Sequence, residues 1–247
     1  MLSALGLAGP SAHPASGVFI PSDGDRSGVV RSRNWSGYAV RSKSHAITSV
    51  TGTFVVPAVT NSPIGIANTW AGIGGFSKGS HDLIQAGTVQ ESEFFGRHYY
   101  AWYELLPNGV VHLHRCSGDS KCRVNKGDRI AVSVRQLASH RWRIALNDRG
   151  HWSWSKKVSY HSSRSSAEWI LEAPSIGFGQ PPLANVGTVH FGPTARYATG
   201  SGTRPLGRGH PVRILLTGQA GPATPSALAH RGQSFNDCAY KKSCPRP

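Results

Sequence analysis

The stretch Ser166-Ala167-Glu168-Trp169-Ile170-Leu171-Glu172-Ala173-Pro174 decides how the rest of the chain is interpreted. As a strand, it places Ala167, Trp169 and Leu171 on one face. Glu168, Ile170 and Glu172 then share the other face. Burying a carboxylate in the middle of an apolar strand is costly unless it has a partner. Two interpretations are open at this point: an outward-facing Glu on a half-exposed sheet, or a catalytic carboxylate on a rigid element.

Short strands separated by turn residues recur along the chain. The 247 residues include 29 Gly and 16 Pro, and helical periodicity is nearly absent. This pattern predicts an all-β sandwich or barrel. No change in composition separates two domains, and we expect one sandwich. The expected strands cover residues 34–40, 47–57, 67–75, 82–89, 99–107, 128–134, 141–146, 152–158, 166–174, 184–191 and 212–217.

The first 33 residues differ in composition from the rest. Residues 1–33 are rich in Gly, Pro, Ser and Arg, and we expect a disordered leader, either a signal-peptide remnant or a propeptide. Residues 34–247 then form a single β-sandwich domain. Within it, residues 192–210 are rich in Gly and Arg and are expected to form a mobile loop.

The chain is strongly basic. Lys plus Arg number 27 and Asp plus Glu number 12, which gives a formal net charge of +15. Such a field favours electrostatic association with anionic polymers. Because the basic residues are scattered rather than clustered, the charge is equally consistent with a role in solubility.

The four cysteines form two pairs with the same spacing, Cys116 with Cys122 and Cys238 with Cys244. Each pair brackets a short polar loop, which favours local disulfides and an oxidising compartment. Neither pair has the usual ligand spacing of a zinc site. No apolar stretch is long enough to span a membrane. We therefore expect a secreted, extracellular protein without a membrane span.

Three other motifs were weighed and set aside. Residues 75–79 (Gly-Phe-Ser-Lys-Gly) match a nucleophile elbow, but the residues that follow lead into a strand rather than the required helix. Residues 118–120 (Gly-Asp-Ser) lie inside a cysteine loop. His112 and His114 alternate on a strand face but lack an evident third ligand. We predict no metal site.

Seven segments, in order, resemble the glutamic peptidases, also called eqolisins. The resemblance runs from about Asn34 to Phe191, with a weaker echo at residues 225–228. No single segment is decisive, but their shared order is a strong signal. They are Asn34-Trp35-Ser36-Gly37, Gly52-Thr53-Phe54-Val55-Val56-Pro57, Trp70-Ala71-Gly72-Ile73-Gly74-Gly75, Leu83-Ile84-Gln85-Ala86-Gly87, Ala101-Trp102-Tyr103-Glu104, Ala167-Glu168-Trp169-Ile170-Leu171-Glu172 and Ala184-Asn185-Val186-Gly187-Thr188-Val189-His190-Phe191.

The resemblance implies a fold and a set of site residues. The fold is a sandwich of two antiparallel sheets, a lectin-like jelly roll of the concanavalin type, with a concave substrate groove. Gln85 and Glu168 match the catalytic pair of the family. The expected substrate-binding residues are Trp35, Trp70, Gly74, Trp102 and Glu104. Gly74 is a departure, because the family often carries Asp at this position.

The chemistry of this pair follows from the two residue types. A Glu carboxylate can take a proton from water and return it to the leaving amine. A Gln amide can donate an N–H to the oxyanion and orient the water with its carbonyl. The ordinary pKa of Glu suits moderately acidic pH. We expect a monomeric, acid-active endopeptidase that cleaves polypeptides and needs no metal or other cofactor.

Rival functions stay open at this stage. The same architecture hosts lectin-like modules, so a weak or inactive protein that binds carbohydrate or anionic polymer is the main alternative. A glycoside hydrolase that uses Glu104 and Glu168 as paired carboxylates is another.

Overall fold

The computed structural model describes residues 17–26, 28–42, 45–60, 64–77, 79–177 and 179–247. These residues contain one short 3-10 helix, η1 (Leu206–Arg208), and none of their helices is long and apolar enough to cross a membrane. The strands are β1 (Pro21–Arg26), β2 (Val29–Ser32), β3 (Trp35–Arg41), β4 (Ser49–Val55), β5 (Gly65–Gly74), β6 (Leu83–Glu93), β7 (Gly96–Leu105), β8 (Val111–His112), β9 (Arg129–Ala138), β10 (Arg141–Asp148), β11 (Trp152–Ser159), β12 (Ser166–Glu172), β13 (Thr188–Phe191), β14 (Arg196–Thr199), β15 (Gly202–Pro205), β16 (Val212–Leu216), β17 (Ala223–Pro225) and β18 (Phe235–Ala239).

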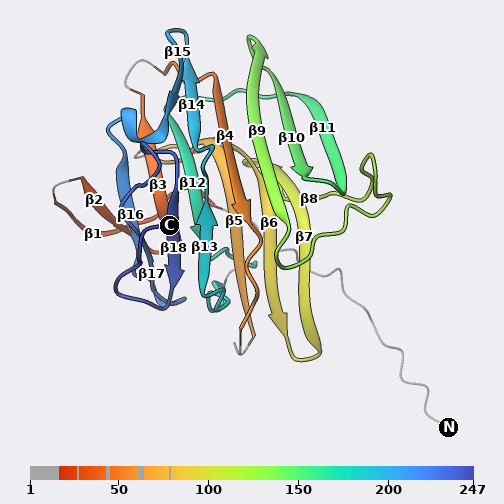
Figure 1. Cartoon of the computed structure of the whole chain (residues 1–247). Helices are drawn as coiled ribbons and strands as arrows, with labels where there is room; N and C mark the ends of the chain where they lie inside the picture. Colours follow the sequence, from red (N-terminus) through yellow and green to blue (C-terminus); the bar gives the residue numbers. More distant parts are fainter. Residues whose placement is uncertain (1–16, 27, 43–44, 61–63, 78, 178) are drawn as a thin grey trace.

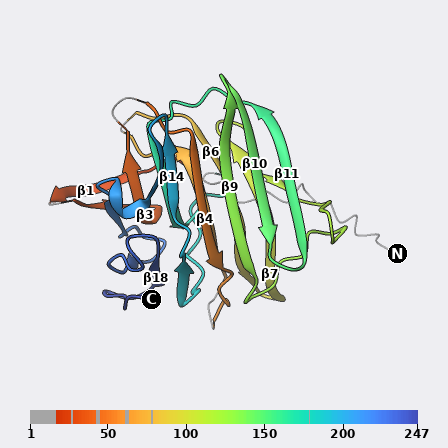
Figure 2. The same ribbon diagram turned by 45° about the horizontal axis from the view of Figure 1, so that its top comes forward.

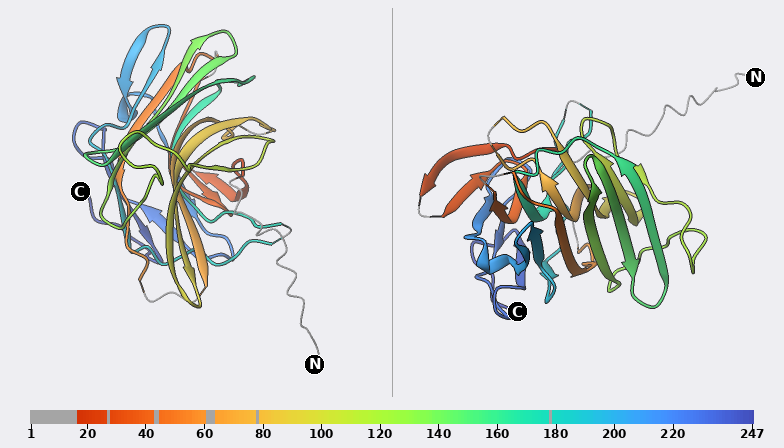
Figure 3. Two further views of the ribbon diagram at one scale, coloured as in Figure 1. Left: turned by 90° about the vertical axis from the view of Figure 1, so that its right-hand side faces the viewer. Right: turned by 90° about the horizontal axis from the view of Figure 1, so that it is seen from above.

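The strands form two curved layers, which confirms the predicted all-β sandwich (Figures 1 and 3). The first sheet has the antiparallel order β8–β7–β6–β5–β12–β3–β16. In the second sheet, β11–β10–β9–β4 continue into β13, β14 and β18. Figure 2 shows β4, β9 and β10 in front of β6 and β7. β17 pairs with β16 and β18 and so links the two layers.

A large apolar core lies between the sheets. In β9, Ile130, Val132 and Val134 point inward and alternate with more exposed residues, as expected for a strand with one buried face. On β12, the predicted face with Ala167, Trp169 and Leu171 packs into this same core. We call this side of the first sheet the core face.

The opposite side of the first sheet, which we call the Glu168 face, carries a second buried cluster. Its aromatic members include Trp35, Trp70, Phe76 and Trp102, and Ile170 of β12 belongs to it. Every residue of β5 and β12 is buried, so both faces of these central strands are covered.

Part of the expected leader has regular structure. Residues 1–16 lie outside the described residues, but 21–26 and 29–32 form β1 and β2. β2 runs parallel to β16 and buries Val30, because β16 offers an edge that another strand can extend. The proposed domain boundary at residue 34, and cleavage of the leader, stay predictions.

The stretch expected to be a loop, residues 192–210, also contains regular structure. β14 and β15 form a hairpin, β14 pairs with β4, and η1 follows. Tyr197 and Leu206 are buried in the main core, and this burial explains why the segment is ordered. Both predicted disulfides, Cys116–Cys122 and Cys238–Cys244, are present.

Candidate active site

Gln85 and Glu168 are brought together by the register of three neighbouring strands. Gly72, on β5, pairs with Glu168 of β12 on one side and with Gln85 of β6 on the other. Residues directly opposite one another point to the same face of a sheet. Two strand spacings put the backbones of Gln85 and Glu168 about 10 Å apart, with the space above Gly72 between them.

Gly72 lets the Gln85 side chain and the Trp70 ring lie close against the sheet. A Cβ at residue 72 would lie 2.9 Å from the Cβ of Gln85 and 3.0 Å from the Trp70 ring. Any larger residue would therefore collide with the site.

Glu104 lies next along the same row and holds Gln85. The Nε2 of Gln85 donates a hydrogen bond of 2.8 Å to Oε2 of Glu104, and the two residues pair between β6 and β7. Burial raises the pKa of Glu104 to about 9, and the charge of Glu172 adds to the rise while the bond from Gln85 opposes it. Glu104 is therefore neutral at acidic and at neutral pH.

Glu168 is completely buried, and neither of its carboxyl oxygens makes a well-aligned hydrogen bond, although the Ser166 hydroxyl lies near them. Burial raises its pKa well above the ordinary value, with the Ser166 hydroxyl opposing and the charge of Asp82 adding to the rise. Oε1 of Gln85 and Oε1 of Glu104 also lack partners. Buried polar atoms without partners are costly, and when they gather in one place they call for a functional explanation.

Tryptophans border this row on the Glu168 face. The indole N–H of Trp70 donates a 2.7 Å hydrogen bond to Oε2 of Glu172, and Trp35 packs edge-on against Trp70 at 4.9 Å between ring centroids. Trp102, two residues before Glu104, is fully buried, and its indole N–H is without a partner. The predicted groove residues Trp35, Trp70, Trp102 and Glu104 thus share one face with Glu168.

Two segments lie over the Glu168 face. The Gly17 N–H donates to Oε1 of Glu172 at 2.9 Å, and the Gly17 carbonyl accepts from the Trp35 indole at 3.0 Å. The Phe19 N–H donates to the Gly75 carbonyl at 3.0 Å, and the Phe19 ring packs against Trp35 and Phe76. The start of the described chain and the segment after β5 therefore cover the part of the Glu168 face around Trp35 and Glu172.

Sequence analysis missed Asp82. Gly74 has a φ of +94°, and a Cβ there would lie 2.8 Å from the Asp82 Oδ2 and from its carbonyl oxygen. The Ser163 N–H holds this Oδ2 at 2.7 Å. A carboxylate thus stands where a side chain at position 74 would be. One sequence feature could have indicated Asp82: it directly precedes the strand residue Leu83, which pairs with Gly74.

Comparison with known proteins identifies the family. Residues 33–228 match the sequence profile described as the Peptidase A4 family. The chain belongs to this family. It is therefore a peptidase, as the order of its motifs predicted. No curated protein matches the chain.

Solved structures show the same fold. Scytalido-glutamic peptidase with a transition state analog inhibitor aligns with a TM-score of 0.66 and 19% identity, covering 84% of this chain and 98% of that one. SCP-B, a member of the eqolisin family in complex with the tripeptide Ala-Ile-His, gives 0.63 and 19% over the same shares, 84% and 98%. Aspergilloglutamic peptidase from Aspergillus niger gives 0.59 and 20%, covering 71% and 99%.

Proposed function

We propose that this peptidase is a secreted, acid-active glutamic endopeptidase whose catalytic pair is Glu168 and Gln85. The observation that carries the proposal is the row Glu168–Gly72–Gln85, in which two buried polar side chains share one face of the sheet and keep unpartnered oxygens. Once the site opens, a water molecule and a peptide carbonyl bound between the two side chains would supply the missing partners.

The reaction needs only these two side chains and water. The ionised Glu168 removes a proton from the water, whose oxygen attacks the carbonyl carbon of the peptide. The second N–H of the Gln85 amide stabilises the oxyanion, since the first is given to Glu104. Glu168 then passes its proton to the leaving nitrogen, and the C–N bond breaks.

Neighbouring residues position this pair. Neutral Glu104 fixes the orientation of the Gln85 amide without adding a negative charge beside the oxyanion. Asp82 takes the place of the acidic residue that the family often carries at position 74, and it acts on Glu168 through its charge. Trp35, Trp70 and Trp102 provide apolar walls for an extended polypeptide.

The covered groove must open before a polypeptide can enter. Residues 17–19 bond to Glu172, Trp35 and Gly75, as an occupant of the groove would. We propose that the leader acts as a propeptide and that its removal, together with movement of the segment after β5, exposes the pair. Renewed hydration then lowers the pKa of Glu168 towards its ordinary acidic value.

Other features support the cellular setting. Two disulfides fit an oxidising, extracellular environment. Two solved relatives are complexes with a peptide-based transition state analog and with a tripeptide, which supports polypeptides as substrates here. The net charge of +15 favours binding to anionic polymers as a secondary property.

A digest of denatured casein by the full chain, scanned from pH 2 to 7, tests the proposal. We expect cleavage in the acidic part of the range, unchanged by EDTA or by serine- and cysteine-directed reagents. Absence of cleavage at every pH, combined with retention on carbohydrate or polyanion columns, would overturn the peptidase activity in favour of the lectin-like binding module.

A further inference from the structure

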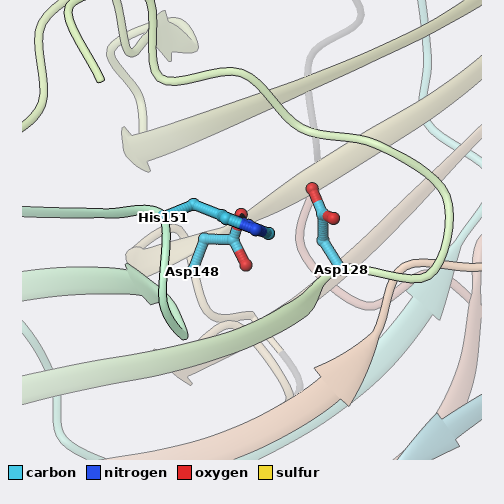
Figure 4. A group of neighbouring side chains, drawn as sticks. All are labelled: Asp128, Asp148 and His151. Atoms are coloured by element: carbon cyan, nitrogen blue, oxygen red, sulfur yellow. Dashed lines mark hydrogen bonds and ion pairs between the residues drawn. The ribbon is translucent and has the colours of Figure 1, made fainter. Parts of the chain in front are cut away.

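Three potential metal ligands meet at one end of the second sheet, on strands that do not form the Glu168 face. Asp128 directly precedes β9, Asp148 ends β10, and His151 lies in the turn before β11. One ligand atom from each lies within 4.8 Å of the others. Figure 4 shows the Asp148 and His151 side chains extending from one turn towards Asp128.

Asp148 is the residue that makes this more than an exposed acidic cluster. Its side chain is only 1% exposed, its Oδ2 lies 2.8 Å from Nδ1 of His151, and its Oδ1 has no hydrogen-bond partner. Leaving a buried carboxylate oxygen unpaired is costly. Asp128 is also held in place, because the Asn125 N–H donates to its Oδ2 at 2.6 Å.

The local charge favours a cation. The whole chain has only 12 acidic residues, yet Asp119, Asp128 and Asp148 gather in this region. The nearby Arg123 already pairs with Asp119 at 3.8 Å, and it does not neutralise the other two carboxylates. His151 supplies a positive charge beside Asp148 only when its imidazole is protonated. When the imidazole is neutral, the two close carboxylates repel each other unless a cation lies between them.

We propose that Asp128, Asp148 and His151 bind a divalent transition-metal ion of the zinc type. Zn²⁺ accepts imidazole nitrogen together with carboxylate oxygen, whereas Ca²⁺ prefers oxygen ligands throughout. In a tetrahedral zinc site the ligand atoms are about 3.4 Å apart. Asp148 Oδ2 and His151 Nδ1, now 2.8 Å apart, would separate slightly, and Asp128 would move in by up to about 1.4 Å.

A cavity of about 450 Å³, lined by Asp148, His151 and Asp119, borders the cluster and leaves room for water as a fourth ligand. Because the ligands join the start of β9 to the end of β10, the ion stabilises the second sheet and takes no part in peptide hydrolysis. Sequence motifs do not indicate this site, because its three ligands do not have the spacing of a common metal-binding motif.

Isothermal titration of the metal-stripped full chain with Zn²⁺ at pH 7.5 tests the proposal. We expect one site per chain, with affinity reduced at least tenfold in His151→Ala and in Asp148→Asn. The His151 side chain is 62% exposed, so its removal leaves the fold intact even if Asp148→Asn does not fold. Zn²⁺ should also raise the Tm of the wild type by a few degrees, and not that of His151→Ala.

The control is His140→Ala. The rings of His140 and His161 stack with their centroids 3.9 Å apart, and this pair is the main rival site for zinc. The substitution removes one ring of that pair. The variant should bind Zn²⁺ like the wild type. Binding that is lost in His140→Ala, or that persists unchanged in His151→Ala, overturns the proposal. So does tight Ca²⁺ binding that survives His151→Ala. Casein cleavage at acidic pH is scored separately, and its presence or absence does not bear on this site.

Discussion

The two faces of β12 are equally buried but differ in how their polar groups are satisfied. On the core face, Trp169 packs into the main core and its indole N–H donates to the Thr51 carbonyl at 2.8 Å. On the Glu168 face, the carboxyl of Glu168 is just as inaccessible and makes no well-aligned hydrogen bond. The difference teaches that buried polar groups with hydrogen-bond partners stabilise the fold. Buried polar groups without such partners indicate a site for a ligand or water.

Substitutions on the two faces should therefore act on different quantities. Gln85→Ala, on the Glu168 face, is expected to lower kcat by about 10²–10³ because the oxyanion loses a donor. The Tm should fall by only a few degrees, because the variant loses one hydrogen bond, from Nε2 to Glu104, while Oε1 of Gln85 has no partner to lose. Peptide hydrolysis and thermal unfolding of the same preparation measure both. A proportionate loss of stability and activity would contradict the division between faces.

Leu171→Ala, on the core face of β12, should show the reverse. Leu171 is fully buried, so its truncation costs about 2–5 kcal/mol of unfolding free energy. This corresponds to a drop in Tm of roughly 5–15 °C. At 25 °C, kcat per folded molecule should stay within about threefold of wild type. Denaturant unfolding measures the loss of stability, and active-site titration counts the folded, active molecules. A kcat reduced as strongly as in Gln85→Ala would break the comparison.

The buried carboxyls also predict how stability depends on pH. Burial raises the pKa of Asp237 to about 8 and that of Glu104 to about 9, so the folded state holds protons that the unfolded state releases near pH 4. Stability should therefore fall as pH rises from about 4 towards 8–9. We expect the Tm to be several degrees higher at pH 4.5 than at pH 8.

Asp237→Asn sharpens this test. The Ser36 hydroxyl donates to Oδ1 of Asp237 at 2.7 Å, and an Asn keeps that acceptor without titrating. The variant should show a shallower fall in Tm between pH 4.5 and 8. A Tm that rises with pH in the wild type would contradict the assigned pKa directions.

The smallest effect is expected at the cover of the Glu168 face. The Phe19 ring packs against Trp35 and Phe76, so Phe19→Ala should loosen the cover and raise initial cleavage rates a few-fold before any processing. Rates measured immediately after addition of substrate, compared with those after prolonged incubation at acidic pH, separate loosening from processing. An unchanged initial rate would show that Phe19 does not limit entry.

Much of this organisation follows from local sequence. Alternation along residues 166–174 predicted which face of β12 holds Glu168, and the order of the motifs predicted the family and the fold. Asp82 and the groups around Asp148 were missed because their partners, Gly74 and Asp128, are brought close only by strand pairing. The leader was misjudged because β2 is ordered by β16, a strand far along the chain.

The central claim is that Glu168 performs the chemistry without contributing to the fold. Its most direct test is the kcat of Glu168→Gln on a defined peptide at acidic pH, measured beside the Tm of the same sample. We expect the kcat to fall at least about 10³-fold. The Tm should equal or exceed that of wild type, because the amide replaces a buried titratable group. A kcat within about threefold of wild type in a folded Glu168→Gln protein would contradict it.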